Sequence, residues 1–123
     1  MGLFTNPVAL NDGVADKTFS FRAQLPDKKA VVGEWIEAAA PLADESKLII
    51  KHDVSSPTVR RRLLQRSINV LLADGITRKP VTCNLTVTYH PSHAEADVAK
   101  AMKIIADSVA EAGFTTNFLR GLI

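Results

Sequence analysis

The chain has 123 residues, of which 46% are hydrophobic and 23% are charged, and its formal net charge is +2. This length fits one domain, and this hydrophobic fraction is that of a globular protein and excludes wholesale disorder. The net charge is too small to indicate a nucleic-acid binder, so that function depends on the local distribution of charge. The single cysteine, Cys83, excludes an intramolecular disulfide and a cysteine-based zinc cluster, and it favours a reducing compartment.

No targeting or membrane-spanning segment is expected. The first seven residues lack a cationic region followed by an apolar stretch, so they do not resemble a secretion signal. Asn6 stands where a myristoylation motif requires Ser or Thr. No apolar run approaches the roughly 18 residues that span a bilayer. We therefore expect a soluble, cytoplasmic protein with no membrane partner.

The first part of the chain predicts β structure. Asn11-Asp12-Gly13 is a tight-turn signal, which indicates a short hairpin at the start. Residues 17–22 alternate polar and apolar side chains, and this places Phe19 and Phe21 on one strand face. Residues 26–29 predict a turn. Residues 31–37 predict the next strand, although residues 34–40 are also compatible with a helix by propensity.

Three more strands are expected after a loop at residues 39–45. The strand at residues 47–54 has Leu48, Ile50 and Val54 on one face and Lys47, Lys51 and Asp53 on the other. A turn at residues 55–58 leads to a long strand at 59–70, and a loop around 73–75 leads to a strand at 81–89. The last strand has the clearest alternation, with four inward residues (Cys83, Leu85, Val87, Tyr89) and four outward ones (Thr82, Asn84, Thr86, Thr88).

The pattern changes to helix after Pro91. Ser92 and Glu95 have the spacing of a capping box, so we expect Ser92 to cap this helix and Gly113 to end it. Its apolar stripe is Val98, Ala101, Met102, Ile105 and Val109. A second short helix follows, capped by Thr115 or Thr116, with Phe118, Leu119 and Leu122 on its apolar side. The prediction is a single α+β domain over residues 1–123: an N-terminal β-hairpin (1–16), a five-stranded antiparallel sheet (17–90) and two C-terminal helices (91–123) on one sheet face.

The proportions of this fold predict a dimer. A five-stranded sheet is about 24 Å wide, whereas one helix is about 10 Å across. A single long helix therefore leaves part of the apolar sheet face uncovered, and soluble monomers rarely expose such a patch. A second subunit that lays its own helix across the gap resolves the problem.

The usual signs of catalysis are missing from the sequence. His52, His90 and His93 do not have the spacing of a metal site, and His90 and His93 are better explained as capping or exposed residues of a turn. His52 and Asp53 point to opposite faces of a strand, which breaks a relay between them. No glycine-rich phosphate loop or nucleophile elbow is present. We expect no enzymatic activity, no metal, no cofactor and no small-molecule substrate.

A basic cluster is the main candidate for function. Arg60, Arg61, Arg62 and Arg66 fall within seven residues, and Lys47 and Lys51 lie on the preceding strand. A hairpin of these strands would form a positive patch able to bind phosphate, although a basic strand edge that discourages aggregation is an equally good explanation. Strict alternation places Arg62 and Arg66 on the inward side with Leu64, and a bulge or an escape past the sheet edge must resolve this conflict. The cluster is therefore compatible with both a phosphate-binding patch and a protective strand edge.

The order of elements and several short motifs resemble the coat proteins of single-stranded RNA bacteriophages, the levivirus-like family. The resemblance covers nearly the whole chain. It rests on Val32-Gly33-Glu34-Trp35-Ile36, on the turn at Ser55-Ser56 followed by basic residues, and on Asn84-Leu85-Thr86-Val87-Thr88 leading to Lys100-Ala101-Met102. It implies an intertwined homodimer that builds an icosahedral shell, with single-stranded RNA on the inner sheet face, in a virion assembled in the cytoplasm of a bacterial host.

The resemblance also implies roles for individual residues. In studied members the inner face binds an RNA hairpin and represses translation. The implied RNA-binding residues here are Val32, Lys47, Ile49, Lys51, Arg60, Arg61, Leu63, Gln65, Arg66, Thr82, Asn84 and Thr86. The helix residues implied at the dimer interface are Val98, Met102, Ile105, Val109, Phe118 and Leu119. The implied inter-dimer loop comprises Ala73, Asp74, Gly75, Ile76 and Thr77.

The sequence departs from the family at the RNA face. Well-known members have an aromatic residue near Thr82 and small hydroxyl residues near Ile49 and Leu63, so this chain lacks the expected base-stacking side chain. Charge-driven packaging is therefore expected more than tight recognition of one hairpin. Two alternatives remain: a cellular RNA-binding or ribosome-associated module that does not assemble, and an enzyme with a composite site at a dimer interface that uses His90, His93 or Asp97.

Overall fold

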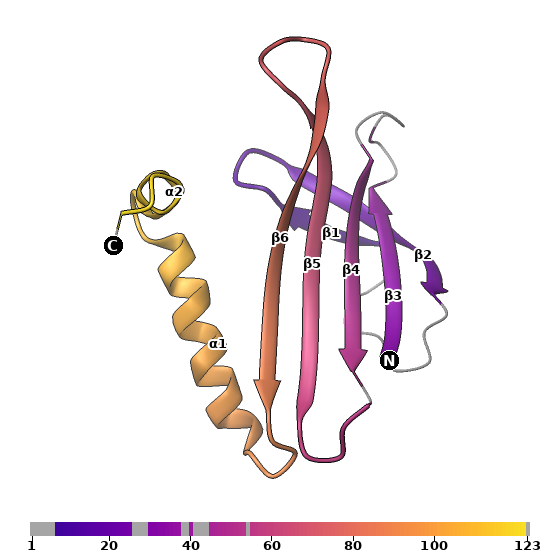
Figure 1. Ribbon diagram of the computed structural model, residues 1–123, viewed down its shortest axis with the longest axis vertical. Coiled ribbons are helices and arrows are strands. Elements are labelled where there is room, and N and C mark those ends of the chain that lie inside the picture. Colours follow the sequence, from indigo (N-terminus) through magenta and orange to yellow (C-terminus); the bar gives the residue numbers. More distant parts are fainter. Residues whose placement is uncertain (1–6, 26–29, 38–39, 41–44, 54, 123) are drawn as a thin grey trace. The chain divides into compact units, whose positions relative to one another are not determined.

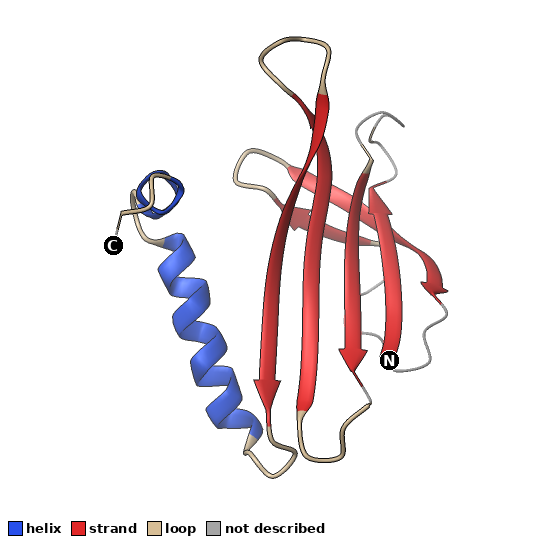
Figure 2. Cartoon of the chain, in the orientation of Figure 1, coloured by secondary structure: helices blue, strands red, loops and turns tan. Residues whose placement is uncertain are grey.

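The structure is a computed structural model that describes residues 7–25, 30–37, 40, 45–53 and 55–122. Its elements are β1 (Val8–Asn11), β2 (Asp16–Leu25), β3 (Ala30–Glu37), β4 (Ser46–Asp53), β5 (Arg60–Leu71), β6 (Arg78–Tyr89), α1 (Glu95–Ala110) and α2 (Phe114–Leu119) (Figures 1 and 2). The predicted α+β class and element order are confirmed, and residues 30–37 form a strand rather than a helix. The predicted turn at 26–29, most of the loop at 39–45, and Val54 lie outside the described residues.

The chain forms two compact units, residues 1–88 and residues 89–123. The first unit is an antiparallel sheet in which each strand neighbours the next along the chain, in the order β1-β2-β3-β4-β5-β6. The N-terminal hairpin thus continues directly into the sheet, which has six strands rather than five. Short turns are sufficient to connect such a meander. The hairpin turn has the predicted chemistry: Gly13 adopts φ 93°, and Asn11 Oδ1 accepts its N–H at 2.7 Å.

A β-bulge bends the sheet near its N-terminal end. The register between β2 and β3 shifts between Phe21 and Ala23, so Arg22 is the extra residue. Bulges increase the local twist of a strand. β1 and β2 run obliquely to β3, β4 and β5 (Figure 1), and Val8 and Leu10 of β1 pack against the core. The bend therefore closes the hairpin over one side of the sheet.

The core of this unit lies under the central strands. Phe19, Trp35, Leu48 and Ile50 are buried and contact one another, and Leu64 packs against them. Gly33 faces this cluster: a Cβ atom there would lie 2.9 Å from Cζ3 of the Trp35 ring, closer than real Cβ contacts. The Gly-x-Trp spacing in β3 therefore has a physical reason, because the indole ring occupies the space that a side chain at position 33 would need.

The second unit differs from the sequence predictions at its caps. Ala94 is the N-cap of α1 and makes no side-chain hydrogen bond, so the prediction that Ser92 caps this helix is wrong. Two histidines close the turn instead: His93 Nδ1 accepts the His90 N–H, and His90 Nδ1 accepts the Ser92 N–H, both at 3.0 Å. These bonds hold the N–H groups of His90 and Ser92 in the turn that precedes α1.

The connection between the helices also begins and ends elsewhere than predicted. α1 ends at Ala110 with Glu111 as its C-cap, and Gly113, with φ 78°, is the N-cap of α2. Thr115 and Thr116 lie inside α2, so the prediction that one of them caps it is wrong. A left-handed residue at this point suits glycine, which has no Cβ to clash.

Candidate nucleic-acid interface

One side of β4, β5 and β6 collects most of the predicted RNA-binding residues, and we call it the polar face. The β4–β5 register is unbroken from Ser46↔Ile68 to Asp53↔Arg61, so directly paired residues share a side of the sheet. The polar face therefore carries Lys47, Ile49, Lys51 and Asp53 from β4 and Arg61, Leu63, Gln65 and Ser67 from β5. Thr82, Asn84 and Thr86 of β6 are exposed, and strand alternation places all three on one side.

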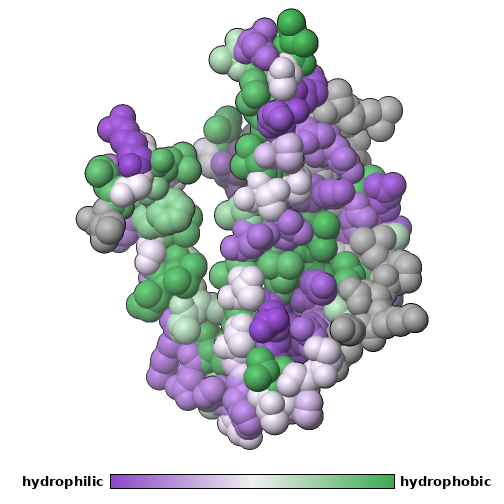
Figure 3. Space-filling view, in the orientation of Figure 1, coloured by the Kyte–Doolittle hydropathy of each residue, from purple (hydrophilic) through white to green (hydrophobic). Residues whose placement is uncertain are grey.

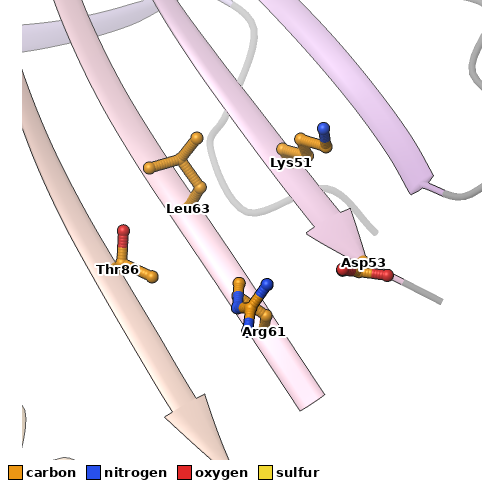
Figure 4. A pocket seen from close by; sticks show the side chains of 5 residues that line it. All are labelled: Lys51, Asp53, Arg61, Leu63 and Thr86. Carbon is orange, nitrogen blue, oxygen red and sulfur yellow. The ribbon is translucent and has the colours of Figure 1, made fainter. Parts of the chain in front are cut away.

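A hollow in the polar face shows that β6 presents the same side. Its volume is about 170 Å³, and it is lined by Lys51 and Asp53 of β4, Arg61 and Leu63 of β5, and Thr86 of β6 (Figure 4). In Figure 4 the side chains of Lys51, Leu63 and Thr86 rise from the same side of three strands, and Asp53 and Arg61 lie near the end of β4 and the start of β5. The strands thus bring residues 35 positions apart in sequence, Lys51 and Thr86, to one site.

The hollow contains a carboxylate as well as cations. Asp53 Oδ1 accepts hydrogen bonds from the Ser55 hydroxyl at 2.6 Å and from the Ser55 N–H at 2.8 Å. These bonds, together with the charges of Arg61 and Lys51, hold the pKa of Asp53 below its usual value. Asp53 is therefore ionised near neutral pH. Strand alternation predicts Asp53 on the same face as Lys51, although Asp53 is not among the residues that the family resemblance implies in RNA binding.

Arg66 lies on the opposite side of the sheet, which contradicts its assignment to the RNA face. It pairs with Leu48 in the register, on the side of the core. Its Nη1 donates to Ser46 Oγ at 2.7 Å, and its Nη2 lies 4.0 Å from Oε2 of Glu37. Its guanidinium carbon lies 5.1 Å from the centroid of the Phe19 ring. Neither a bulge nor an escape past the edge occurs at Arg66, because a carboxylate, a hydroxyl and an aromatic ring satisfy the inward guanidinium.

The same register separates the other arginines. Arg62 pairs with His52 on the core side, and strand alternation places the exposed Arg60 on the side of Arg62. His52 is half-buried there, and its burial together with Arg62 lowers its pKa. The structure thus divides the predicted basic cluster between two faces. Three of the six residues of this cluster lie on the polar face: Lys47, Lys51 and Arg61.

Neighbouring acids reduce the positive charge of the polar face further. Lys47 Nζ lies 3.1 Å from Oε1 of the exposed Glu45. Glu34, which is buried and pairs with Ile49 in the register, lies 3.6 Å from Nη1 of Arg22. Val32 pairs with Lys51 on the polar face but is buried, and it lies outside the hollow's described lining. The face is a mixed polar surface, on which three members of the basic cluster lie among acidic and neutral groups, rather than a purely basic patch.

Cys83, one of the four β6 residues predicted to face inward, is exposed rather than part of the core. The core cluster is built from residues of β2, β3 and β4, and β6 is the last strand in the sheet order. Leu85, Val87 and Tyr89, which were predicted to face inward with Cys83, are half-buried. β6 therefore presents a partly apolar side and an unpaired strand edge within the described part of the chain.

The helical unit exposes its apolar stripe. Neither α1 nor α2 contains a buried residue among those described. Met102, Ile105 and Val109 are 42%, 52% and 56% exposed, and Phe118 and Leu119 are 65% and 78% exposed, whereas Val98 is half-buried. Figure 3 shows hydrophobic residues gathered along the helices. An amphipathic helix normally buries such a stripe, and soluble monomers rarely expose one.

The predicted inter-dimer loop is a compact turn between β5 and β6. Asp74 Oδ1 accepts the N–H groups of Ile76 and Thr77 at 2.9 Å each, and the Thr77 hydroxyl donates to Oδ2 at 2.6 Å. These three bonds lower the pKa of Asp74. Gly75 has φ 73°, and Ile76 is 86% exposed. The loop is thus held in one shape by its own carboxylate while it presents an apolar side chain to solvent.

Other classes of site have little support in the described residues. They contain no group of three or more His, Cys, Asp or Glu side chains arranged to hold a metal ion. Within the same residues, no helix is long and apolar enough to cross a membrane. His52 lies on the core side and Asp53 on the polar face, as predicted, so the two do not form a relay.

The fold is that of levi-like bacteriophage coat proteins. The chain superposes on the subunit of a virus-like particle of Beihai levi-like virus 21 with a TM-score of 0.76 and 15% identity, over 96% of this chain and 95% of that one. It matches the coat protein of bacteriophage EMS014 with a TM-score of 0.66 and 21% identity, over 97% of both chains. It matches a virus-like particle of bacteriophage NT-214 with a TM-score of 0.71 and 13% identity, over 94% and 95%. The sequence matches no protein-family model and no curated protein.

These similarities confirm the resemblance predicted from the motifs at the level of fold. They extend from the N-terminal hairpin to the C-terminal helices, because more than nine-tenths of each of these chains is superposed. The shared feature is the fold, an antiparallel sheet followed by two C-terminal helices.

Proposed function

We propose that this protein is a structural coat protein that forms homodimers, assembles into an icosahedral shell and packages single-stranded RNA against its polar face. The observation that carries the proposal is the fold shared along nearly the whole chain with proteins whose structures are of virus-like particles. A coat protein has no need of catalysis, and we infer a structural rather than an enzymatic role. The protein would then reside in a virion assembled in the cytoplasm of a bacterial host.

The exposed helix stripe supports the homodimer. The helices expose the apolar side chains of Met102, Ile105, Val109, Phe118 and Leu119. A second copy presents the same stripe, and a twofold axis allows two identical apolar surfaces to bury each other. The unpaired edge of β6 supports the same arrangement, because two such edges extend a sheet by antiparallel pairing.

The loop between β5 and β6 supports assembly beyond the dimer. Residues 73–77 project an exposed Ile76 on a turn fixed by Asp74, and an apolar side chain on a preformed turn loses little conformational entropy on binding. We propose that this loop contacts neighbouring dimers in the shell. Its neighbours Leu71 and Leu72 are also exposed and extend the apolar contact.

The polar face supports RNA binding by several weak contacts rather than by one tight site. Lys47, Lys51 and Arg61 offer charge to phosphates, and Gln65, Thr82, Asn84 and Thr86 offer neutral hydrogen-bonding groups. A shell repeats these groups in every subunit, so a modest charge per chain becomes a large positive inner surface. Repression of translation through a hairpin would require one sequence to bind much better than others, and the absence of a stacking aromatic here does not favour that role.

The experiment that tests RNA packaging compares two double variants of equal charge. Lys51→Ala with Arg61→Ala removes two cations from the polar face, and Arg60→Ala with Arg62→Ala removes two from the opposite side. We expect the first variant to lower the RNA content of purified particles and the second to leave it near the wild-type value, measured by the ratio of absorbance at 260 and 280 nm. An equal loss of RNA content in both variants would show that the polar face is not the RNA surface. Intact particles in both variants would show that the loss is not caused by misfolding.

A further inference from the structure

The turn between β6 and α1 is held by two imidazole rings. His93 Nδ1 accepts the His90 N–H, and His90 Nδ1 accepts the Ser92 N–H, both at 3.0 Å. The two rings lie edge to face, with their centroids 6.2 Å apart. The His93 N–H donates to the His90 carbonyl at 2.9 Å. Each ring therefore holds one backbone N–H group of an exposed turn at residues 90–93.

Both imidazole bonds exist only while the rings are neutral. A neutral imidazole has one nitrogen that accepts and one that donates, whereas an imidazolium ion has two donors and no acceptor. A proton on Nδ1 of either ring would point at the N–H group that the ring now holds, and two charged rings at this separation would repel each other. Histidine takes up its proton between about pH 8 and about pH 5. The two bonds are therefore present above that range and are lost as the pH falls through it.

Carboxylates are the charged groups that follow the turn most closely in the helical unit. Glu95 and Asp97 occupy the first turn of α1. Within the residues that the structure describes, neither imidazole forms an ion pair. The other ionisable residues of this unit are Tyr89 before the turn and, after it, Lys100, Lys103, Asp107, Glu111 and Arg120. Lys103 pairs with Asp107, and α2 (Phe114–Leu119) carries no ionisable side chain.

A second arrangement of the same residues is available to the start of α1. Ala94, the N-cap, has φ −66° and ψ 138° and makes no side-chain hydrogen bond, so the first N–H groups of the helix lack a side-chain cap. Ser92 and Glu95 have the spacing of a capping box, in which the serine hydroxyl accepts the Glu95 N–H and the glutamate carboxylate accepts the Ser92 N–H. In the structure, His90 Nδ1 holds that Ser92 N–H. The histidine bond and the capping box therefore compete for one backbone donor.

We propose that the start of α1 is an acid-operated switch between these two arrangements. At neutral pH the two rings hold the turn, and Ala94 is the N-cap. In mild acid the charged rings release the Ser92 N–H to the Glu95 carboxylate, and the N-cap moves from Ala94 to Ser92. Glutamate carboxylates keep their charge to about pH 4, so the capping box remains possible over the range in which histidine titrates.

Hydrogen–deuterium exchange of the intact protein tests the switch at about pH 8 and about pH 5, with single-amide resolution and correction for the intrinsic effect of pH on exchange. On acidification the protection of the His90 amide should fall about fivefold, because it loses one hydrogen bond, and that of the Glu95 amide should rise by a similar factor. The Ser92 amide should stay protected, because its N–H only changes its acceptor. Unchanged protection at His90, or a loss there without a gain at Glu95, would overturn the inference.

Three variants separate the switch from general effects of acid. His90→Asn combined with His93→Asn replaces each Nδ1 with an amide oxygen that accepts at any pH, so protection should no longer respond to acid. Ser92→Ala removes the alternative cap but leaves both imidazole bonds, so in acid His90 should still lose protection and Glu95 should gain none. The matched control is His52→Asn, which changes the third histidine of the chain and should keep the wild-type response. A response that survives in the double variant, or a gain at Glu95 that survives in Ser92→Ala, would refute the switch, and the wild-type comparison decides the matter if the double variant does not fold.

The switch has a consequence for assembly that rests on the proposed homodimer. The turn links the sheet to the helices that expose the apolar stripe, so a dimer that fits the neutral arrangement loses affinity as that arrangement is depopulated. In sedimentation experiments the dissociation constant of the wild-type dimer should rise about fivefold in acid, and that of the double asparagine variant should not. A switch in exchange without a change in dimer affinity would refute only this coupling. A monomer at both pH values would refute the proposed homodimer, whereas the exchange result would still decide the switch.

Discussion

Replacement of Arg66 by Met tests whether this arginine stabilises the core side of the sheet. Met keeps the length and the apolar stem of arginine, but it removes the guanidinium that bonds to Ser46 Oγ and the Ser67 carbonyl. It also removes the cation that lies beside the Phe19 ring and 4.0 Å from Glu37. The variant therefore deletes a polar network on the core side while it leaves the polar face unchanged.

The expected loss of stability depends on the interactions that Arg66 makes and on the partners that Glu37 keeps without it. A hydrogen bond to a charged group contributes about 1.5–3 kcal/mol, and the contact with the Phe19 ring contributes about 0.5–1 kcal/mol. The Arg66 side chain is 31% exposed, and solvent screening weakens its ionic contact. Glu37 keeps Ser46 Oγ at 2.7 Å and Lys17 at 3.9 Å, which limits the penalty of an unpaired carboxylate. We expect the free energy of unfolding to fall by about 2 kcal/mol.

The assay is urea unfolding at one fixed protein concentration, because self-association contributes to apparent stability. The matched control is Arg62→Met, the same change on the same strand and side, where no ion pair occurs among the described residues. The control should change stability by about 0.5 kcal/mol or less. RNA content should stay at the wild-type value in both variants. If Arg66→Met keeps full stability but loses RNA, Arg66 contacts RNA and the register described here is wrong.

Three further changes test other parts of the structure. Gly33→Ala forces a Cβ to within 2.9 Å of the Trp35 ring, and overpacking of this kind should lower the free energy of unfolding by about 1–3 kcal/mol, measured by urea titration. The loop held by Asp74 should be sensitive to acid: hydrogen bonds lower the folded-state pKa of Asp74, so its contribution is fully present above the unfolded-state pKa of about 3.9 and is lost as the pH falls through the lower folded-state value. Amide exchange at Thr77 should accelerate over that range, and an unchanged rate would contradict the role of the carboxylate. Ile105→Glu charges the exposed helix stripe and should convert dimers to monomers in sedimentation experiments, whereas Lys100→Glu, off the stripe, should not.

Strand positions and faces could be predicted from the sequence because they depend on local patterns. The period of two in residues 81–89 predicts a strand, and Asn11-Asp12-Gly13 predicts a tight turn. The structure confirms both. The opposite faces of Leu48 and Lys51 follow from the same period. Residues that pair directly on neighbouring strands lie on the same face, so the face of one strand fixes the face of the next. Most of the predicted polar residues therefore share a side.

The interactions that neutralise Arg66 on the core side could not be predicted, because its partners are distant in the sequence. Alternation correctly placed Arg66 inward, and the conflict with the basic-patch hypothesis was visible in the sequence. What no local pattern supplies is that Glu37, 29 residues earlier, and Ser46 lie on neighbouring strands where they neutralise it. A run of basic residues on one strand is therefore a poor predictor of a basic surface, since adjacent arginines point to opposite sides.

Capping and edge effects explain the remaining errors. The Ser92 and Glu95 spacing is a genuine capping signal, but in the structure two histidine side chains close the turn that contains Ser92, and Ala94 is the N-cap. Cys83 follows the inward alternation of its strand, yet β6 lies at the end of the sheet order, away from the core cluster. Both outcomes depend on which neighbours are present in three dimensions.

The central claim, that this chain builds an RNA-containing shell, is tested most directly by its state of assembly. The protein would be expressed in bacteria and separated by size-exclusion chromatography with detection at 260 and 280 nm, and the leading peak would be imaged by negative-stain microscopy. We predict uniform closed particles rich in nucleic acid. A monomer or small dimer free of nucleic acid would contradict the claim, and a monomer with selective RNA affinity would instead favour an RNA-binding module that does not assemble.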